Sequence, residues 1–241
     1  AHFLLPGNLG SSSYEIEKET TNAALRYRYS VNDQVGIGAL ATIRENDGYH
    51  NYVTSTDIKY QPSDNDKIEV QLMHSDTQLA DIYLEDIKGW DNEQANRAKT
   101  MKDTDVAYRL HYQHDTRDWF FKMNHTNIGK DFRADLAFFN NADYIKNVIG
   151  GGYIWRGEKE DWWSRIRIDG DVDRTTNQDG EQIEQEAEIY FNLNGPRQSF
   201  FRLGLVDRDK VGNRPDFEDL PNFDELTSAL MMAIRSNTEE F

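Results

Sequence analysis

Three glutamates at alternate positions, Glu184, Glu186 and Glu188, are the strongest candidates for acid–base chemistry in the sequence. In an extended strand these side chains share one face and lie about 7 Å apart, a separation at which paired carboxylates hydrolyse glycosides. The same spacing is also typical of an acidic stripe that is neutralised by basic side chains on adjacent strands. The neutralising residues would then be Arg165, Arg167 and Arg202. We favour the stripe, so no catalytic residue is expected.

A second acidic ladder has the spacing of a candidate cation site. Its members are Asp169, Asp171, Asp173, Asn177 and Asp179. An EF-hand loop requires Gly at its sixth position, but this ladder has Arg174 there. The six His residues include no pair at the spacing of metal ligands on one helix or one strand. We therefore expect no metal ion and no cofactor.

Alternation of apolar and polar residues identifies the elements that would position these carboxylates. Leu25, Tyr27 and Tyr29 alternate with Arg26 and Arg28. Successive side chains of a strand point to opposite faces, so such a segment has one apolar and one polar face. The pattern predicts strands at 21–31, 34–44, 50–61, 66–76, 104–114, 118–126, 146–156, 162–173, 182–193 and 199–207, with an eleventh around 226–236.

Tight and long connections alternate along the chain between the predicted strands. The tight ones are rich in turn-forming residues, as in Asn32-Asp33 and Asn194-Gly195. Only an antiparallel meander places every second connection at the same end, and outer-membrane barrels keep their short turns on the periplasmic side. The longer loops are 45–49, 77–103, 127–145, 174–181 and 208–225.

The predicted fold class is therefore all-β: an antiparallel up-and-down β-barrel of the outer-membrane type, with roughly ten or more strands. Residues 1–19 lack a clear period and are expected to be irregular, and 20–241 are expected to form a single barrel domain. The start, Ala1-His2-Phe3, indicates a processed or excised form. An incomplete piece of a larger barrel is accordingly an alternative.

The two faces of the predicted strands differ in charge. The residues collected in the phase of Leu25, from Leu25 to Leu205, include none that is charged, whereas the opposite phase carries many charged residues. An Arg or Lys at the middle of a lipid-facing surface costs about 2–4 kcal/mol, so a membrane barrel requires a charge-free outer face. The charged residues expected to face the lumen are Arg26, Arg28, Arg109, Lys122, Arg165, Arg167, Glu184, Glu186, Glu188 and Arg202.

Aromatic residues make up 12% of the chain and include 12 Tyr, 12 Phe and 5 Trp. Trp155 and Trp162 flank a short connection, which is where a membrane-interface girdle places such side chains. Aromatic rings of this kind could instead be platforms on which sugars stack. We favour the girdle, which would be formed by Tyr27, Tyr29, Tyr60, Tyr112, Trp119, Tyr153, Trp155 and Trp162.

The 241 residues have a formal net charge of -16, and 29% of them are charged. This acidic excess argues against a nucleic-acid partner, because phosphate binding needs surplus Lys and Arg. No run of 18 apolar residues occurs, so no membrane helix is predicted. Cys is absent, which excludes disulfides and thiolate metal sites. A membrane barrel tolerates many charges because half of each strand can face a wet lumen.

Two stretches of the chain are similar to a known family. They are Asn127-Ile128-Gly129-Lys130-Asp131-Phe132-Arg133-Ala134-Asp135-Leu136-Ala137-Phe138, and the run from Trp162-Trp163-Ser164-Arg165-Ile166-Arg167 to Asn194-Gly195-Pro196-Arg197-Gln198-Ser199-Phe200. Together they resemble the uncharacterised C-terminal barrel domain that follows a family-9-like carbohydrate-binding module in Gram-negative outer-membrane proteins. The resemblance covers most of residues 20–207 and departs from the family at Ala137, where Gly is usual.

The resemblance implies an outer-membrane location in a Gram-negative bacterium. Outer-membrane lipid would be the main partner, and glycans or other outer-membrane proteins would be further partners. The expected function is a non-enzymatic outer-membrane β-barrel, a pore or surface scaffold associated with glycan uptake or handling. No carbohydrate-binding module is recognised in the chain, so the glycan link rests on the resemblance alone. The alternative is a soluble β-sandwich that binds or cleaves polysaccharide.

Overall fold

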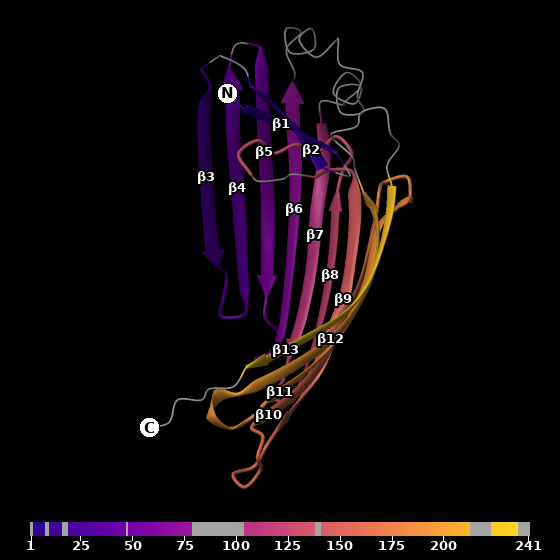
Figure 1. Ribbon diagram of the computed structural model, residues 1–241. Helices are drawn as coiled ribbons and strands as arrows, with labels where there is room; N and C mark the ends of the chain where they lie inside the picture. Colours follow the sequence, from indigo (N-terminus) through magenta and orange to yellow (C-terminus); the bar gives the residue numbers. More distant parts are fainter. Residues whose placement is uncertain are drawn as a thin grey trace.

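The computed structural model of the protein is an all-β molecule built around one large sheet (Figure 1). The structure describes residues 2–7, 10–15, 19–46, 48–78, 104–137, 141–212 and 223–235. The helical content of these residues is a single 3₁₀ turn at Pro196–Gln198. None of the helical structure in the described ranges has the length and apolar character needed to cross a membrane.

A small hairpin precedes the large sheet. β1 (His2–Gly7) pairs with β2 (Gly10–Glu15) in antiparallel register. The large sheet has 11 strands, which lie side by side in chain order, each antiparallel to its neighbours. They are β3 (Thr21–Ser30), β4 (Val35–Asn46), β5 (Tyr49–Tyr60), β6 (Asp66–Gln78), β7 (Thr104–Asp115), β8 (Trp119–Ile128), β9 (Tyr144–Arg156), β10 (Arg165–Thr176), β11 (Gln182–Asn194), β12 (Phe200–Gly212) and β13 (Phe223–Arg235).

The antiparallel up-and-down sheet confirms the predicted all-β architecture, and each predicted strand corresponds to one of β3–β13. The largest differences concern the strand ends. β10 begins at Arg165 instead of 162, and β12 continues to Gly212 through residues that were expected to be loop. Alternation locates a strand well, whereas its ends also depend on the pairing with its neighbours.

The N-terminal segment 1–19 was expected to be irregular, but it contains the β1–β2 hairpin. Its sequence has Pro6 and Gly7 at the end of β1 and a serine run in β2, so it lacks the period-two alternation that identifies a half-buried strand. Backbone pairing between the two segments forms the ladder in the absence of that side-chain pattern.

Two connections that were expected to be long are short. β4 and β5 are joined by 47–48, and β10 and β11 by 177–181, because the strands extend into the predicted loops. Gly48 and Gly180 have φ angles of 83° and 89°, a conformation that glycine adopts without steric cost in tight turns.

Among the three loops that were expected to be longest, 127–145 contains a folded segment, residues 129–137. The loops expected at 77–103 and 208–225 lie outside the described residues, apart from the portions that belong to β6, β12 and β13.

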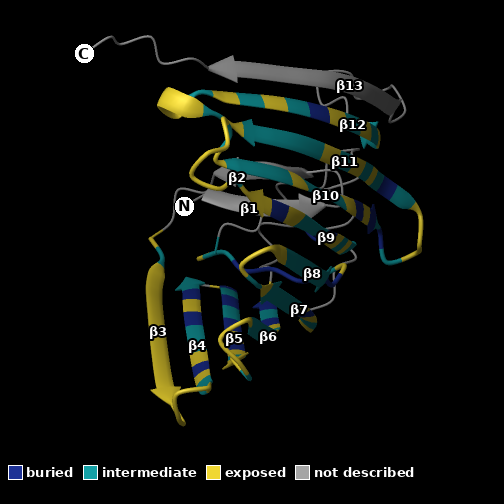
Figure 2. Ribbon diagram, turned by 90° about the horizontal axis from the view of Figure 1, so that it is seen from below, coloured by how far each residue is buried: buried dark blue, intermediate teal, exposed yellow. Residues whose placement is uncertain are grey.

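The large sheet is strongly curved. Seen from below, it forms an open C, with β3 at one end, β7–β9 at the bend and β10–β12 along the other arm (Figure 2). β3 and β13 are the two edges, and in the described part of the chain each pairs with a neighbour on one side only. The curvature gives the sheet a concave face and a convex face.

The convex face is apolar and exposed. Leu25, Leu72 and Ile149 are 73%, 56% and 54% exposed, although each is a large aliphatic residue. Further exposed hydrophobic residues on this face are Tyr27, Tyr29, Ile37, Ile43, Ile58, Val106, Tyr108, Val172, Ile189 and Leu205. They come from strands throughout β3–β12, and an apolar surface of this extent is uncommon on a protein that is surrounded by water.

The buried core is small and lies on the concave face, near the start of β5 and β7. It consists of Val53, Ala107, Ile128, Phe132, Ala134 and Ala142. Phe132, Ala134 and Ala142 belong to the connection between β8 and β9, which folds back over the sheet. This connection therefore supplies the apolar contacts that one curved sheet does not make with itself.

β10 and β11 approach each other closely at Gly170 because glycine has no side chain. A Cβ at Gly170 would overlap the backbone oxygen of Glu188, and a backbone atom of a paired strand cannot easily move aside. We expect Gly170→Ala to lower the free energy of unfolding by about 1–3 kcal/mol, the usual cost of overpacking. Urea titration followed by tryptophan fluorescence measures this change.

Gly36→Ala is the matched control, since its added Cβ would lie 4.0 Å from the nearest atom, the backbone oxygen of Tyr29. That variant should change the free energy of unfolding by less than about 0.5 kcal/mol. Equal destabilisation by both substitutions would contradict the close-approach argument.

Candidate functional site

Most of the strand charges share the concave face of the sheet. The register places Arg28, Gly38, Asp57, Gln71 and Arg109 in one row across β3–β7. Residues opposite one another in paired strands point to the same side of the sheet, and the buried core lies on that side. By the same register, all the charged residues expected to face a lumen lie on the concave face.

The carboxylates among β3–β7 are engaged by neighbouring cations. Arg26 Nη2 lies 2.5 Å from Asp57 Oδ2, and Lys67 Nζ lies 2.9 Å from Glu69 Oε1. All four side chains are partly exposed, so each pair alone contributes little to stability. Each pair neutralises one carboxylate on the concave face, and the same face also holds further arginines and lysines.

Three carboxylates of β10 and β11, those of Asp173, Glu184 and Glu186, are paired with basic residues that were not predicted to neutralise them. Arg208 Nε lies 2.6 Å from Glu184 Oε1 and 3.1 Å from Glu186 Oε2. Lys146 Nζ lies 2.9 Å from Asp173 Oδ2. These carboxylates are therefore held in ion pairs with basic side chains of β12 and β9.

The arginines that were expected to neutralise the three glutamates of β11 have other neighbours. Arg167 Nε lies 2.9 Å from Asp169 Oδ1, and the guanidinium carbon of Arg202 lies 4.0 Å from the centre of the Tyr190 ring. Antiparallel pairing places both arginines beside the end of β11, far along the strand from Glu184. Alternation predicts which face of the sheet a side chain lies on. Its position along the neighbouring strand depends on the register of the pairing.

Two glycines on the concave face make room for ion pairs that cross a strand. Lys122 Nζ on β8 lies 2.7 Å from Asp171 Oδ1 on β10, and Gly150 of β9 lies between them. A Cβ at Gly150 would lie 2.6 Å from the Lys122 side chain and 2.5 Å from Asp171 Cβ. Gly38 makes room for the guanidinium of Arg26 in the same way.

The β8–β9 connection folds over the concave face, and we call its first part, residues 129–137, the latch. The side-chain amide of Asn51 donates to the backbone oxygen of Arg133 at 3.0 Å, and the backbone N–H of Asp135 donates to Asn51 Oδ1 at 3.0 Å. The N–H of Arg133 also donates to Ser75 Oγ at 3.3 Å. Side chains of β5 and β6 thus hold the latch backbone.

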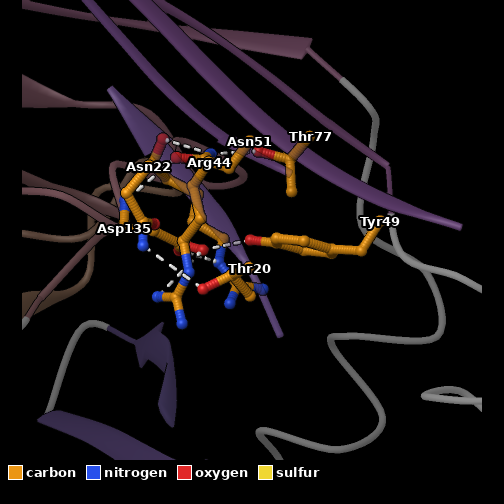
Figure 3. A network of polar contacts seen from close by, with 8 residues as sticks. Thr20, Asn22, Arg44, Tyr49, Asn51, Thr77 and Asp135 are labelled. Atoms are coloured by element: carbon orange, nitrogen blue, oxygen red, sulfur yellow. Dashed lines mark hydrogen bonds and ion pairs between the residues drawn. The ribbon is translucent and has the colours of Figure 1, made fainter. Parts of the chain in front are cut away.

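Charged groups of the latch are buried together. The side chains of Arg133 and Asp135 are each 2% exposed, and Arg133 Nε donates to Asp135 Oδ1 at 2.7 Å. The hydroxyl of Tyr49 donates to the same carboxylate, and Arg44 Nη1 lies 3.6 Å from it (Figure 3). Two cations and a phenol therefore surround one buried carboxylate. A charged group that is removed from water requires such ion pairs and hydrogen bonds to offset the cost of its desolvation.

The stretch Gly-x-Asp-Phe that carries much of the family resemblance lies at the start of the latch. The N–H of Asp131 donates to Asp105 Oδ2 at 2.7 Å. A side chain at Gly129 would overlap the same Asp105 carboxylate, and Phe132, at 1% exposure, is part of the core. Gly129, Asp131 and Phe132 thus all help to fasten the latch to the sheet.

Aromatic residues cluster on the convex face, near the end of the sheet with the β3–β4 and β5–β6 turns. Trp119 lies opposite Tyr153, whose ring centre is 4.6 Å from that of Trp155. The rings of Tyr112 and Phe121 are 6.1 Å apart. The predicted interface aromatics that are exposed are Tyr27, Tyr29, Tyr60, Trp119, Tyr153, Trp155 and Trp162, whereas Tyr112 is half-buried.

Four residues of these networks were not predicted from the sequence to be part of a site: Lys146, Arg208, Arg133 and Asp135. Arg208 continues the alternation of Arg202, so a longer β12 would have included it. Arg133 and Asp135 are not part of an apolar–polar alternation, because their burial depends on contacts with β5 and β6. No local pattern identifies such residues.

A scan against protein-family models finds no family that matches the chain, and a search of curated proteins finds no match. The resemblance to a barrel domain accordingly stays a prediction. Among the residues that the structure describes, no group of three or more His, Cys, Asp or Glu side chains could hold a metal ion. The candidate site is the concave face, with its ion pairs and its latch.

The buried carboxylate of Asp135 offers a direct test of the latch. We expect Asp135→Ala to lower the free energy of unfolding by about 3–5 kcal/mol, because it removes the buried carboxylate that faces Arg133 and Arg44. The control is Asp179→Ala, whose side chain is 71% exposed and lies 3.7 Å from Lys130. Urea titration should detect a loss of about 1 kcal/mol or less for this exposed pair. A similar small loss for Asp135→Ala would contradict the anchoring role.

Proposed function

We propose that the chain forms the wall of a non-enzymatic β-barrel in the outer membrane of a Gram-negative bacterium, as a pore or a surface scaffold. The observation that carries this proposal is the exposed convex face of β3–β12, which is largely apolar and carries few charged residues. Lipid is the environment in which such a face is stable, and a wet interior suits the charged concave face.

The length of the apolar face supports the same proposal. Tyr52 and Tyr60 lie on this face of β5, with Thr54, Thr56 and Ile58 between them. Tyr52 to Tyr60 is a run of nine residues, and a tilted transmembrane β-strand needs about 9–11 residues to cross the bilayer. Aromatic side chains also bound the apolar band of an outer-membrane barrel.

A barrel wall also requires its edges to be paired. We infer that β3 and β13 pair with each other or with further strands of the same kind. The reason is that an unpaired strand edge exposes N–H and C=O groups, which lipid cannot satisfy.

The second candidate is a soluble β-sandwich that binds or cleaves polysaccharide. In that fold the apolar face would form the core between two sheets. Leu25 and Leu72, at 73% and 56% exposed, favour the membrane wall over this alternative. Glycan uptake or handling, and binding to glycans or other outer-membrane proteins, are supported by the family resemblance alone.

Partitioning of the full chain between detergent and water tests the proposed function. We expect the chain to require detergent and to migrate faster on a gel when it is not heated, because a closed barrel resists unfolding by the gel detergent. Conductance across a planar bilayer then distinguishes a pore from a scaffold. A monodisperse chain that is soluble in water without detergent would overturn the membrane proposal.

A charge placed on each face of β9 tests which face meets lipid. Ile149 is exposed on the convex face, and Val148 is on the concave face, where Asp173 lies opposite it. We expect Ile149→Arg to lower the free energy of unfolding in phospholipid vesicles by about 2–4 kcal/mol. Val148→Arg is the control and should cost less than about 1 kcal/mol. Equal costs would argue against a lipid-facing convex surface.

A further inference from the structure

We propose that the concave face of β3–β7 holds a binding site for small solutes with two or more carboxylate or phosphate groups. The site is a hollow of about 380 Å³, and the charged residues that line it include Arg26, Arg28, Lys59, Arg109, Asp57 and Glu69. Its role as a filter for transported solutes rests on the proposed function, whereas the binding itself does not.

The hollow contains more positive charge than its own carboxylates can neutralise. Asp57 is paired with Arg26, and Glu69 is paired with Lys67. In the described part of the chain, no carboxylate lies within ion-pair distance of Arg28, Lys59 or Arg109. Arg109 Nε donates to a neutral acceptor, Asn124 Oδ1, at 3.0 Å, which leaves its charge uncompensated.

This local excess is opposite in sign to the whole chain, which has a net charge of -16. The acidic side chains of the concave face lie mainly on β10 and β11, where Arg208 and Lys146 engage them. The charges are therefore separated along the curved sheet, with a surplus of cations on β3–β7. A basic hollow in an acidic protein selects anions by raising their local concentration.

The arrangement of the cations indicates the class of ligand. The register places Lys59 of β5 two strands across and two residues along from Arg28 of β3, so their backbones are about 12 Å apart. Cations at such a separation suit two anionic groups of one small molecule better than a single charge. Guanidinium groups also donate paired N–H bonds to carboxylate or phosphate, which favours these two chemistries.

Isothermal titration calorimetry with citrate and with pyrophosphate tests the site, and the two probes separate a carboxylate from a phosphate preference. The full chain is titrated in the medium that keeps it folded. We expect saturable binding of at least one probe, with at least about tenfold weaker affinity in Lys59→Gln/Arg109→Gln, because two charge-assisted contacts are lost. Trimethyl citrate, which has the same skeleton without the charges, should not bind.

Arg174→Gln is the matched control, because Arg174 is exposed on the opposite face of β10. That variant should bind the probes as the wild type does. Absence of saturable binding of both probes, or unchanged affinity in the double variant, would overturn the site. If the chain requires detergent but binds neither probe, the anion site is overturned and the membrane proposal stands. If the chain is soluble in water and binds a probe, the membrane proposal is overturned and the anion site stands.

Discussion

The antiparallel register of β3–β13 is the constraint on which the rest of the structure depends. Side chains alternate with a period of two, so a slip of one residue in any strand would move its charges to the convex face and its aliphatic residues to the concavity. The register instead aligns Arg28, Asp57 and Arg109 in one row of the concave face. It also leaves few charged residues, among them Arg174 and Asp207, on the opposite face of β3–β12.

The latch is the main exception to this simple division into faces. It brings Arg133 and Asp135 onto the concave side and buries both against β5 and β6. The burial is tolerated because a carboxylate, a guanidinium and a phenol satisfy one another away from water. A sheet with one exposed apolar face has little core of its own, so this polar network and the few apolar residues beneath it define how the concave side is filled.

The concave face combines neutralised and surplus charge. The carboxylates of Glu184, Glu186 and Asp173 are held by Arg208 and Lys146, so Glu184 and Glu186 are poorly suited to act as a free catalytic pair. The arginines and lysine around the hollow of β3–β7 exceed their carboxylate partners. If the convex face lies in lipid, this uneven distribution belongs to the lumen, where it would act on the solutes that enter.

The sequence by itself determined the strands, their up-and-down order and the face on which each residue lies, as for Leu25 and Arg26, because alternation is a local property of an extended backbone. It did not determine which charges meet. Arg208 rather than Arg202 reaches Glu184 because pairing fixes the height of each residue along its neighbour. Only the tertiary structure decided the latch, since Asp135 is buried by contacts with Tyr49 and Asn51, more than eighty residues away in the chain.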